Sequence, residues 1–231
     1  AEAGIKVRLI TDDTSTDPFF TELLEHGNVM WGNTDAIMHH KFILVDAESE
    51  MESWVVSGST NWTYNNLVMD ANNLIAIQDR SLAKAYTVEF NEMWGGSQDE
   101  PNYVLSQFSG EKKNNTPHQF EIGGIKTELY FSPSDKTESR IVEAINNADH
   151  EVIFAMMAFT SDPIRGALID AHNRGVAVKG VIDYIEYSGS EYEALLNAGT
   201  TVIDYTNPDG SSWPDGITIH HKFMVCDYNH A

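Results

Sequence analysis

The string His-x-Lys-x-x-x-x-Asp occurs twice in this chain, once near each end. The first copy lies in "DAIMHHKFILVD" and the second in "GITIHHKFMVCD". A lone copy could arise from composition, but two copies in matched positions of a longer repeat are poorly explained by chance. The chain is therefore expected to fold as two related units, and no other feature of the sequence narrows the fold as much.

The similarity between the two halves extends beyond this string. "GIKVRLITDD" matches "GVAVKGVIDY", and "FFTELLEHGNVMW" parallels "YEALLNAGTTVID". In each half a glycine ends a helix, a β-branched run predicts a strand, and a short helix and a further strand lead to the strand of the histidines. The second half alone inserts "TNPDGSSWPDG" before that strand, as a loop that either lines a site or is a plain surface excursion.

Strands and helices alternate ahead of the second copy. "VIFAMMAF" predicts a short buried strand, and the helix before it has an apolar stripe. The stripe consists of Ile141, Val142, Ala144, Ile145 and Ala148. A second helix is expected to begin at Ser161 or Asp162, with Pro163 in its first turn, and to end at Gly175. This alternation favours an α/β fold with a mostly parallel sheet.

Each half contains segments that the other lacks. After its motif the first half has "SWVVSGSTNWT", a strand "NNLIAIQD" and a helix "SLAKAYTVEFNEMW". We predict that residues 1–95 are the C-terminal part of a first repeat, 96–124 a polar connector, and 125–231 the N-terminal part of a second repeat. On this interpretation the chain is a fragment truncated at both ends, which is expected to be weakly active or inactive alone although its full-length parent is competent.

The amino-acid composition limits the classes of function that the chain can have. The 35 acidic and 14 basic residues give a net charge of -21, which disfavours loose binding to nucleic acid or anionic lipid. The single cysteine, Cys226, forms no internal disulfide. No signal peptide or apolar run long enough for a membrane span is visible. We expect a soluble protein of undetermined location, with a secreted or periplasmic one left open because the N-terminus is taken to be missing; the oligomeric state is also open.

Each motif places a histidine and a lysine on the same side of an extended strand, because residues two apart share a face. These pairs are His39 with Lys41 and His220 with Lys222. Near neutral pH a histidine serves as nucleophile, base or acid, and a lysine offers a positive charge to an anionic oxygen. The combination suits a phosphoryl group.

Further polar residues accompany the two pairs. In "GSTNWT", Gly58 permits a close backbone approach, and Ser59 and Asn61 present polar groups on one side. Asp46 and Asp227 fall at strand ends, where each either orients a histidine or caps the following turn. Orientation is the favoured role.

A metal site and a purely structural repeat are the rival interpretations of the motif. Adjacent histidines such as His39 and His40 face opposite sides of a strand, and the lysine beside each would repel a cation, so no metal or other cofactor is predicted. His221 and Cys226 are expected to pack against the opposite face from His220.

The residues "HHKFILVD…GSTNWT" and "HHKFMVCD" resemble the paired HKD motifs of the phospholipase D superfamily. "FAMMAFTSDPIRGALIDAHNRGVAVKGVID" is similar to the opening of a catalytic repeat in its Nuc-like endonuclease branch. The resemblance implies an α/β fold of two phospholipase D-like repeats. Each would be a mixed, mostly parallel sheet flanked by helices, and the two would be related by a pseudo-twofold axis with one site between the motifs.

The resemblance also implies a metal-independent reaction through a covalent phosphohistidine. His39 and His220 would be the nucleophile and the acid/base, with His39 preferred for attack. The other implied roles are phosphate clamps for Lys41 and Lys222, histidine orienters for Asp46 and Asp227, and substrate binding for Ser59 and Asn61. The favoured substrate is a phospholipid; a nuclease acting on DNA or RNA and a non-catalytic binding protein are the alternatives.

Overall fold

The computed structural model describes residues 4–12, 25, 28–32, 36–205 and 217–228. The chain divides into two compact units, and each has a hydrophobic core of its own. Unit 1 comprises Ala1–Val55 and Ala76–Thr137, and unit 2 comprises Val56–Ile75 and Glu138–Ala231. Unit 2 therefore takes in a segment of the first half of the sequence, residues 56–75.

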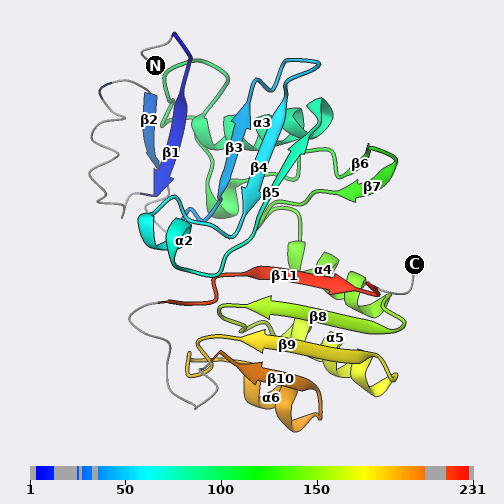
Figure 1. Cartoon of the computed structure of the whole chain (residues 1–231). Coiled ribbons are helices and arrows are strands. Elements are labelled where there is room, and N and C mark those ends of the chain that lie inside the picture. Colours follow the sequence, from blue (N-terminus) through cyan, green and yellow to red (C-terminus); the bar gives the residue numbers. More distant parts are fainter. Residues whose placement is uncertain (1–3, 13–24, 26–27, 33–35, 206–216, 229–231) are drawn as a thin grey trace. The chain divides into compact units, whose positions relative to one another are not determined.

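Unit 2 is built on a four-stranded sheet (Figure 1). Its strands, in spatial order, are β10 (Thr201–Asp204), β9 (Ala177–Ile182), β8 (Glu151–Met156) and β11 (Lys222–Cys226). The pairs β10–β9 and β9–β8 are parallel, and β8–β11 is antiparallel. The predicted α/β architecture with a mixed, mostly parallel sheet is confirmed.

Three longer helices pack against this sheet. They are α4 (Thr137–Asn146), α5 (Asp162–Asn173) and α6 (Tyr192–Asn197); the short α2 (Tyr64–Val68) lies in the segment from the first half. Ile145, Leu168 and Leu195, one from each longer helix, have no exposed surface, and each such burial contributes about 1.5–3 kcal/mol. The predicted boundaries of α5 are close: Ser161, rather than Asp162, is its N-cap, and its Oγ accepts the Ile164 N–H.

The described residues of unit 1 include several small sheets. Strands β1 (Arg8–Asp12) and β2 (Asn28–Gly32) pair in parallel, and β3 (Phe42–Val45), β4 (Trp54–Gly58) and β5 (Leu74–Gln78) form a second sheet in that order. Residues 56–58 of β4 and 74–75 of β5 belong to unit 2. Helix α3 (Arg80–Trp94) begins at Asp79, whose carboxylate accepts the Leu82 N–H. Leu82 and Ala85 of α3 pack with Val55 of β4 in the core of unit 1.

Residues 96–124, predicted as a connector, belong to unit 1 and have structure of their own. They include the 3-10 turn η1 (Ser109–Glu111) and strand β6 (Gln119–Ile122), which pairs antiparallel with β7 (Ile125–Glu128). Gly123 and Gly124 form the two-residue turn, both with positive φ, as a tight hairpin requires. The predicted boundary at 124/125 thus falls inside a hairpin. The division into repeats 1–95 and 125–231 stays a prediction.

Two predicted features lie beyond what the structure describes. The short helix expected before Gly27 falls almost entirely outside the described residues, and the whole loop 206–216 does as well. Within the described parts of the chain, no helix combines the length and the apolar character needed to cross a membrane.

Candidate active site

The first motif lies in unit 1, immediately before a strand. His39 and Lys41 precede β3, which starts at Phe42, so the histidine is in the approach to the strand and not within it as the pattern predicts. His39 is exposed, and the Lys41 Nζ donates to the His39 carbonyl oxygen at 2.9 Å. The lysine side chain therefore folds back along the histidine that shares its motif.

The second motif, in unit 2, repeats this arrangement. β11 starts at Lys222, and its Nζ donates to the carbonyl oxygen of His220, two residues earlier, at 3.1 Å. Desolvation lowers the pKa of the Lys222 ammonium, although part of this side chain is exposed. In both motifs the lysine ammonium is therefore held at the backbone carbonyl oxygen of the histidine.

The ring of His220 is oriented by polar groups from residues 59–72. Its Nδ1 lies 2.8 Å from the Ser59 carbonyl oxygen and 3.0 Å from the Asn72 Oδ1. A carbonyl oxygen only accepts hydrogen bonds, so Nδ1 carries a proton and donates it. In the neutral ring the lone pair is then on Nε2, which is the nitrogen suited to attack phosphorus or to accept a proton. Because the side chain of His220 is largely buried, this orientation is well defined.

Backbone contacts fix the chain just before His220. The Thr218 N–H donates to the Asp70 carboxylate at 3.2 Å, and the Ile219 N–H donates to the Asp183 carboxylate at 3.0 Å. The His220 N–H donates to the Ala71 carbonyl oxygen at 2.8 Å. Together with the Ala71 N–H, which donates to the Thr218 carbonyl oxygen at 2.9 Å, the bond to Ala71 makes an isolated parallel bridge between Ala71 and Ile219, and β11 begins at Lys222.

Sequence reasoning missed Asp70, Asn72 and Asp183 as parts of this site. Asn72 holds its amide in place by donating from Nδ2 to the Asn66 carbonyl oxygen at 2.9 Å, so that Oδ1 faces His220. The one available signal was the density of amide and acid side chains in "NNLVMDANN", which is unusual directly before an apolar strand. Nothing in that string identifies its partner, which lies 148 residues further along the chain.

Ser59 and Asn61 occupy the turn after β4. The Ser59 Oγ donates to the Asn72 Oδ1 at 2.9 Å and accepts the Asn73 N–H at 3.0 Å, so its hydroxyl supports the amide that contacts His220. The Asn61 N–H donates to the Asn66 Oδ1 at 3.1 Å. Gly58 allows the approach that was expected of it, since a Cβ there would clash with the Asn73 carbonyl oxygen. Ser59 thus belongs with His220, while a direct substrate contact for either residue stays a prediction.

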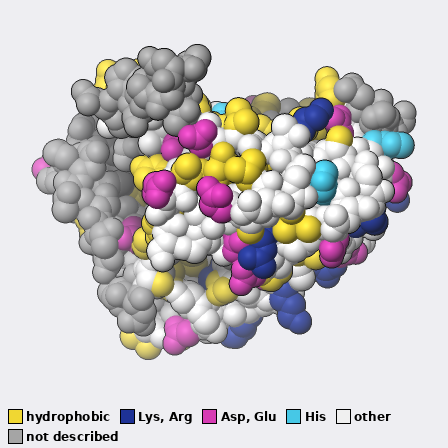
Figure 2. Space-filling model, turned by 90° about the horizontal axis from the view of Figure 1, so that it is seen from below, with side chains coloured by type: hydrophobic (Ala, Val, Ile, Leu, Met, Phe, Trp, Pro, Cys, Tyr) yellow, Lys and Arg dark blue, Asp and Glu magenta, His cyan; other side chains and the backbone are white. Residues whose placement is uncertain are grey.

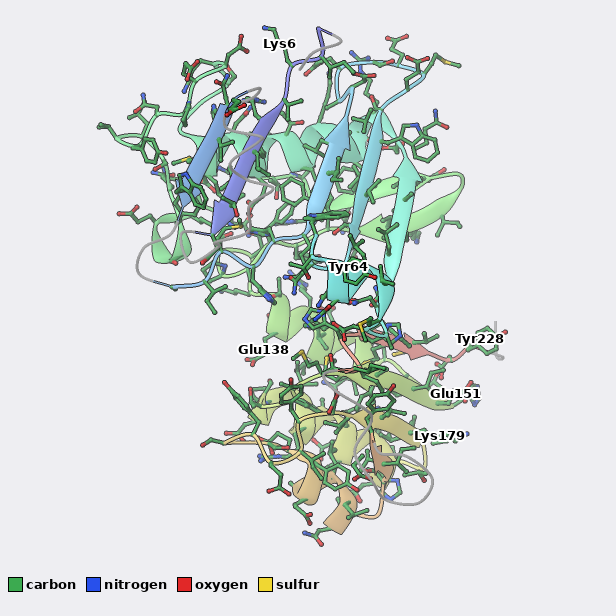
Figure 3. All side chains as sticks on the ribbon, turned by 60° about the vertical axis from the view of Figure 1, so that its left-hand side comes forward. Lys6, Tyr64, Glu138, Glu151, Lys179 and Tyr228 are labelled. Carbon is green, nitrogen blue, oxygen red and sulfur yellow. The ribbon has the colours of Figure 1, made fainter. Side chains whose placement is uncertain are left out.

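The predicted orientation of His220 by Asp227 is wrong. The Asp227 carboxylate accepts the backbone N–H groups of Asp149, His150 and Glu151 at 2.8–2.9 Å, and these bonds lower its pKa to about 2. Figure 3 labels Glu151 and Tyr228 on the same side of the sheet, where β8 starts and β11 ends. With β11 extended between them, Asp227 and His220 are about 20 Å apart, so Asp227 acts as a cap.

Asp46 occupies the corresponding place after β3. It has a positive φ of 45°, as Asp227 has one of 53°, and its carbonyl oxygen accepts the Ser53 Oγ at 2.9 Å. Of the residues between His39 and Asp46, the strand β3 covers Phe42–Val45. Within unit 1, Asp46 shapes the turn that follows β3, while the orientation of His39 by its carboxylate stays a prediction.

The second histidine of each motif faces a different environment from the first. The His40 Nε2 lies 2.9 Å from the Glu89 carboxylate, and the His221 Nδ1 lies 3.4 Å from the Asn73 Oδ1. Desolvation, together with the Lys222 charge, lowers the pKa of His221. Cys226 packs against the core of unit 2. Its predicted position on the face opposite to His220 stays a prediction. Among the described residues no three His, Cys, Asp or Glu side chains gather as a metal site would require.

Comparison with known proteins places these motifs in context. A family model described as cardiolipin synthase, PLD-like domain, matches residues 1–94 and 141–231. The mitochondrial cardiolipin hydrolase of Xenopus tropicalis is 32% identical over 115 residues, which cover 48% of this chain and 50% of that protein. The phospholipase D of Rickettsia prowazekii is 32% identical over 87 residues, covering 36% of this chain and 40% of that protein. The chain thus spans half or less of the length of these relatives.

Two solved structures are similar to the chain. Nuc of Salmonella typhimurium, a phospholipase D family member, is 29% identical, with a TM-score of 0.33 over 42% of this chain and 60% of that chain. The polyphosphate kinase of Porphyromonas gingivalis shares the fold, with a TM-score of 0.54 over 79% of this chain and 26% of that chain, at 10% identity.

Proposed function

Since the chain belongs to the phospholipase D superfamily, we propose that it hydrolyses phosphodiesters through a covalent phosphohistidine, with His39 and His220 as the two reacting histidines. The observation that carries the proposal is the ring of His220, whose Nδ1 donates to the Ser59 carbonyl oxygen. This bond directs the lone pair of Nε2 away from the carbonyl and stabilises the imidazolium that forms when Nε2 takes a proton.

We assign the attack to His39 and the proton transfers to His220. In the first step the His39 ring nitrogen forms a bond to phosphorus, the bond from phosphorus to the leaving alcohol breaks, and His220 gives its proton to the departing oxygen. In the second step His220 takes a proton from water, whose oxygen bonds to phosphorus as the phosphorus–nitrogen bond breaks. Dividing one displacement in this way lowers the barrier of each part.

The lysines compensate charge in both steps. Each ammonium is held at the backbone carbonyl oxygen of the histidine in its own motif. The non-bridging oxygens of the phosphoryl group become more negative as the attacking and leaving atoms exchange, and a fixed cation stabilises that state more than the ground state. Lys41 and Lys222 therefore act as phosphate clamps.

We propose a phospholipid as the substrate. The segment around Ser59 and Asn72, residues 58–75, carries a single charged side chain, Asp70, which is bound to Thr218 and Asn66. A nucleic acid would favour Lys and Arg along this segment. On the face in Figure 2 the Lys and Arg side chains are scattered among Asp and Glu. The relatives named cardiolipin hydrolase and phospholipase D support the same choice.

The test is a parallel assay of the full-length protein with a chelator present. Its substrates are vesicles of phosphatidylcholine, phosphatidylglycerol or cardiolipin, single- and double-stranded DNA, and the soluble diester bis(p-nitrophenyl) phosphate. We expect turnover of a phospholipid, and a loss of about 10³-fold or more in His39→Ala and in His220→Ala, because each removes one partner of a coupled pair. His150→Ala, at an exposed histidine of unit 2, is the matched control.

Each result decides between functions. Unchanged rates in both histidine variants would overturn the enzyme proposal and leave a binding protein. Turnover of DNA without turnover of any lipid would replace the substrate with a nucleic acid. Loss of activity in chelator would show that a metal ion takes part.

A further inference from the structure

Unit 1 buries an ion pair beside the first motif. The Lys112 Nζ, just after η1, contacts the Glu89 carboxylate of α3, and the two side chains are 3% and 1% exposed. Lys112 also donates to the Ser132 carbonyl oxygen at 2.9 Å and lies 5.8 Å from the centre of the Phe131 ring. Both charges are thus removed from water in a largely apolar setting.

The same carboxylate oxygen accepts a hydrogen bond from His40. The His40 Nε2 lies 2.9 Å from the Glu89 Oε1, and a carboxylate only accepts, so Nε2 carries the proton. The Lys112 Nζ is 3.4 Å from this nitrogen, and the two groups are then both donors that share Glu89 as acceptor. Phe42 and Phe131 meet the His40 ring edge-on. The ring is held by one strong polar bond and by two aromatic contacts.

Stability alone is a weak reason for this pair. A buried ion pair must recover the desolvation of both ions, and replacing it with apolar side chains of similar size is often neutral or stabilising. What Glu89 provides that an apolar side chain does not is an acceptor in a fixed place for His40. Lys112 neutralises the carboxylate and secures it against the Ser132 carbonyl oxygen.

The direction of His40 determines that of its neighbours. His40 shares its backbone with His39 and Lys41, so a ring anchored in unit 1 restricts the positions that these two side chains can take. His39 is exposed, whereas His40 is half-buried. We propose that Glu89 and Lys112 are positioning residues that act through His40 to hold His39 and Lys41 in their reactive orientation. This proposal rests on the phosphodiesterase function above.

The second motif uses a different device. His220 is bonded directly by the Ser59 carbonyl oxygen and the Asn72 amide, whereas its neighbour His221 has no carboxylate partner among the described residues and contacts the Asn73 amide, at 3.4 Å, and the edge of the Phe223 ring. In the second motif the hydrogen bonds hold the reacting histidine, His220, itself. In the first motif the hydrogen bond to Glu89 holds His40, the residue next to the reacting His39. Loss of the Glu89 anchor should therefore impair the first motif alone.

Two double variants test whether Glu89 positions His40. Both variants lack the buried charges of Glu89 and Lys112, so they differ only in the hydrogen-bond acceptor that is left for His40. E89Q/K112M keeps an amide oxygen that can accept from His40, and E89L/K112M has no acceptor. We expect E89Q/K112M to keep kcat on bis(p-nitrophenyl) phosphate within about 3-fold, and E89L/K112M to lose about 100-fold in kcat with KM little changed, because a misplaced reacting group costs rate more than binding. Their Tm values should agree.

The matched control is R165M/E191L, which removes the Arg165–Glu191 ion pair of unit 2, 2.7 Å long, together with the 2.8 Å pair between Arg165 and Asp162. It should leave kcat unchanged. Equal kcat in the two Glu89 double variants, or a kcat that falls in step with Tm, would overturn the positioning role.

Hydrogen exchange separates this proposal from the proposed function. The amides of residues 38–42 should exchange faster in E89L/K112M than in E89Q/K112M, whether or not the protein turns over a phosphodiester. If exchange is equal in the two variants, Glu89 does not position His40. If exchange differs but the unsubstituted protein hydrolyses nothing, the phosphodiesterase function is wrong and the catalytic part of this proposal falls with it.

Discussion

At the scale of single residues, Asp227 shows how one motif letter can serve the fold and not the chemistry. Asp227 accepts three backbone N–H groups at the start of β8, and both Asp227 and Asp46 take a left-handed backbone conformation directly after a strand. In each motif a strand lies between the histidine and the aspartate, β3 over Phe42–Val45 and β11 over Lys222–Cys226. A pattern that repeats a chemical group can therefore be repeating a structural cap.

Asp227 should make stability depend on acid pH. Its pKa is about 2 against an ordinary 3.8, so its contribution is complete above pH 3.8 and is lost as pH falls through 2. Asp227→Asn should lower the free energy of unfolding at pH 7 and flatten its decline between pH 4 and pH 2, as measured by urea unfolding at a series of pH values. Glu186→Gln, at an exposed carboxylate of unit 2, is the control. An unchanged pH profile for Asp227→Asn would contradict the role of cap.

At the scale of elements, the sequence predicted what depends on local pattern. The helices α4 and α5 follow from their apolar stripe and cap, and β8 follows from its apolar run. The approach to β11 could not be predicted, because His220 replaces a strand partner with the Ala71 carbonyl oxygen and the Asn72 amide. Residues 96–124 were expected to be a connector because they are polar, yet Lys112 is buried there against Glu89. Contacts between residues far apart in the sequence determine the structure of both segments, and the polarity of a segment does not predict those contacts.

The end of β4 should tolerate no side chain at position 58. A methyl group there would clash with the Asn73 carbonyl oxygen, so Gly58→Ala should cost about 1–3 kcal/mol in unfolding free energy and should reduce turnover by displacing Asn72. Gly166→Ala is the matched control, because Gly166 lies within α5 with no atom near its added Cβ. It should stabilise by about 0.5–1 kcal/mol. Equal effects of the two changes on denaturant unfolding would show that the approach at Gly58 does not matter.

At the scale of the whole molecule, the compact units do not follow the two halves of the sequence. Residues 56–75 lie in unit 2, where they supply the Ser59 and Asn72 groups that orient His220. The first motif stays in unit 1 with its own anchor, the Glu89 carboxylate. The histidine of the second half is thus set by side chains of the first half.

Hydrogen exchange should follow the units and not the halves. The Asn73 Oδ1 lies 3.4 Å from both the Lys222 backbone nitrogen and the His221 Nδ1. Asn73→Ala should therefore raise exchange in residues 218–222, although they are far away in sequence, and should leave residues 42–45 of β3 unaffected. Exchange measured by mass spectrometry resolves both segments. Faster exchange in β3 alone would contradict the assignment of residues 56–75 to unit 2.

Because residues 56–75 belong to unit 2, the two units become complete at different times during synthesis. The amide of Asn72 leaves the ribosome 148 residues before the histidine that it contacts. At about 5–20 residues per second this is a wait of roughly 7–30 s, which is long compared with the folding of most small domains. Unit 1 can close as soon as Thr137 has emerged, while the segment of the first half that belongs to unit 2 stays without its partners. The nascent chain therefore holds Ser59 and Asn72 without their partner His220 until the last described strand is made.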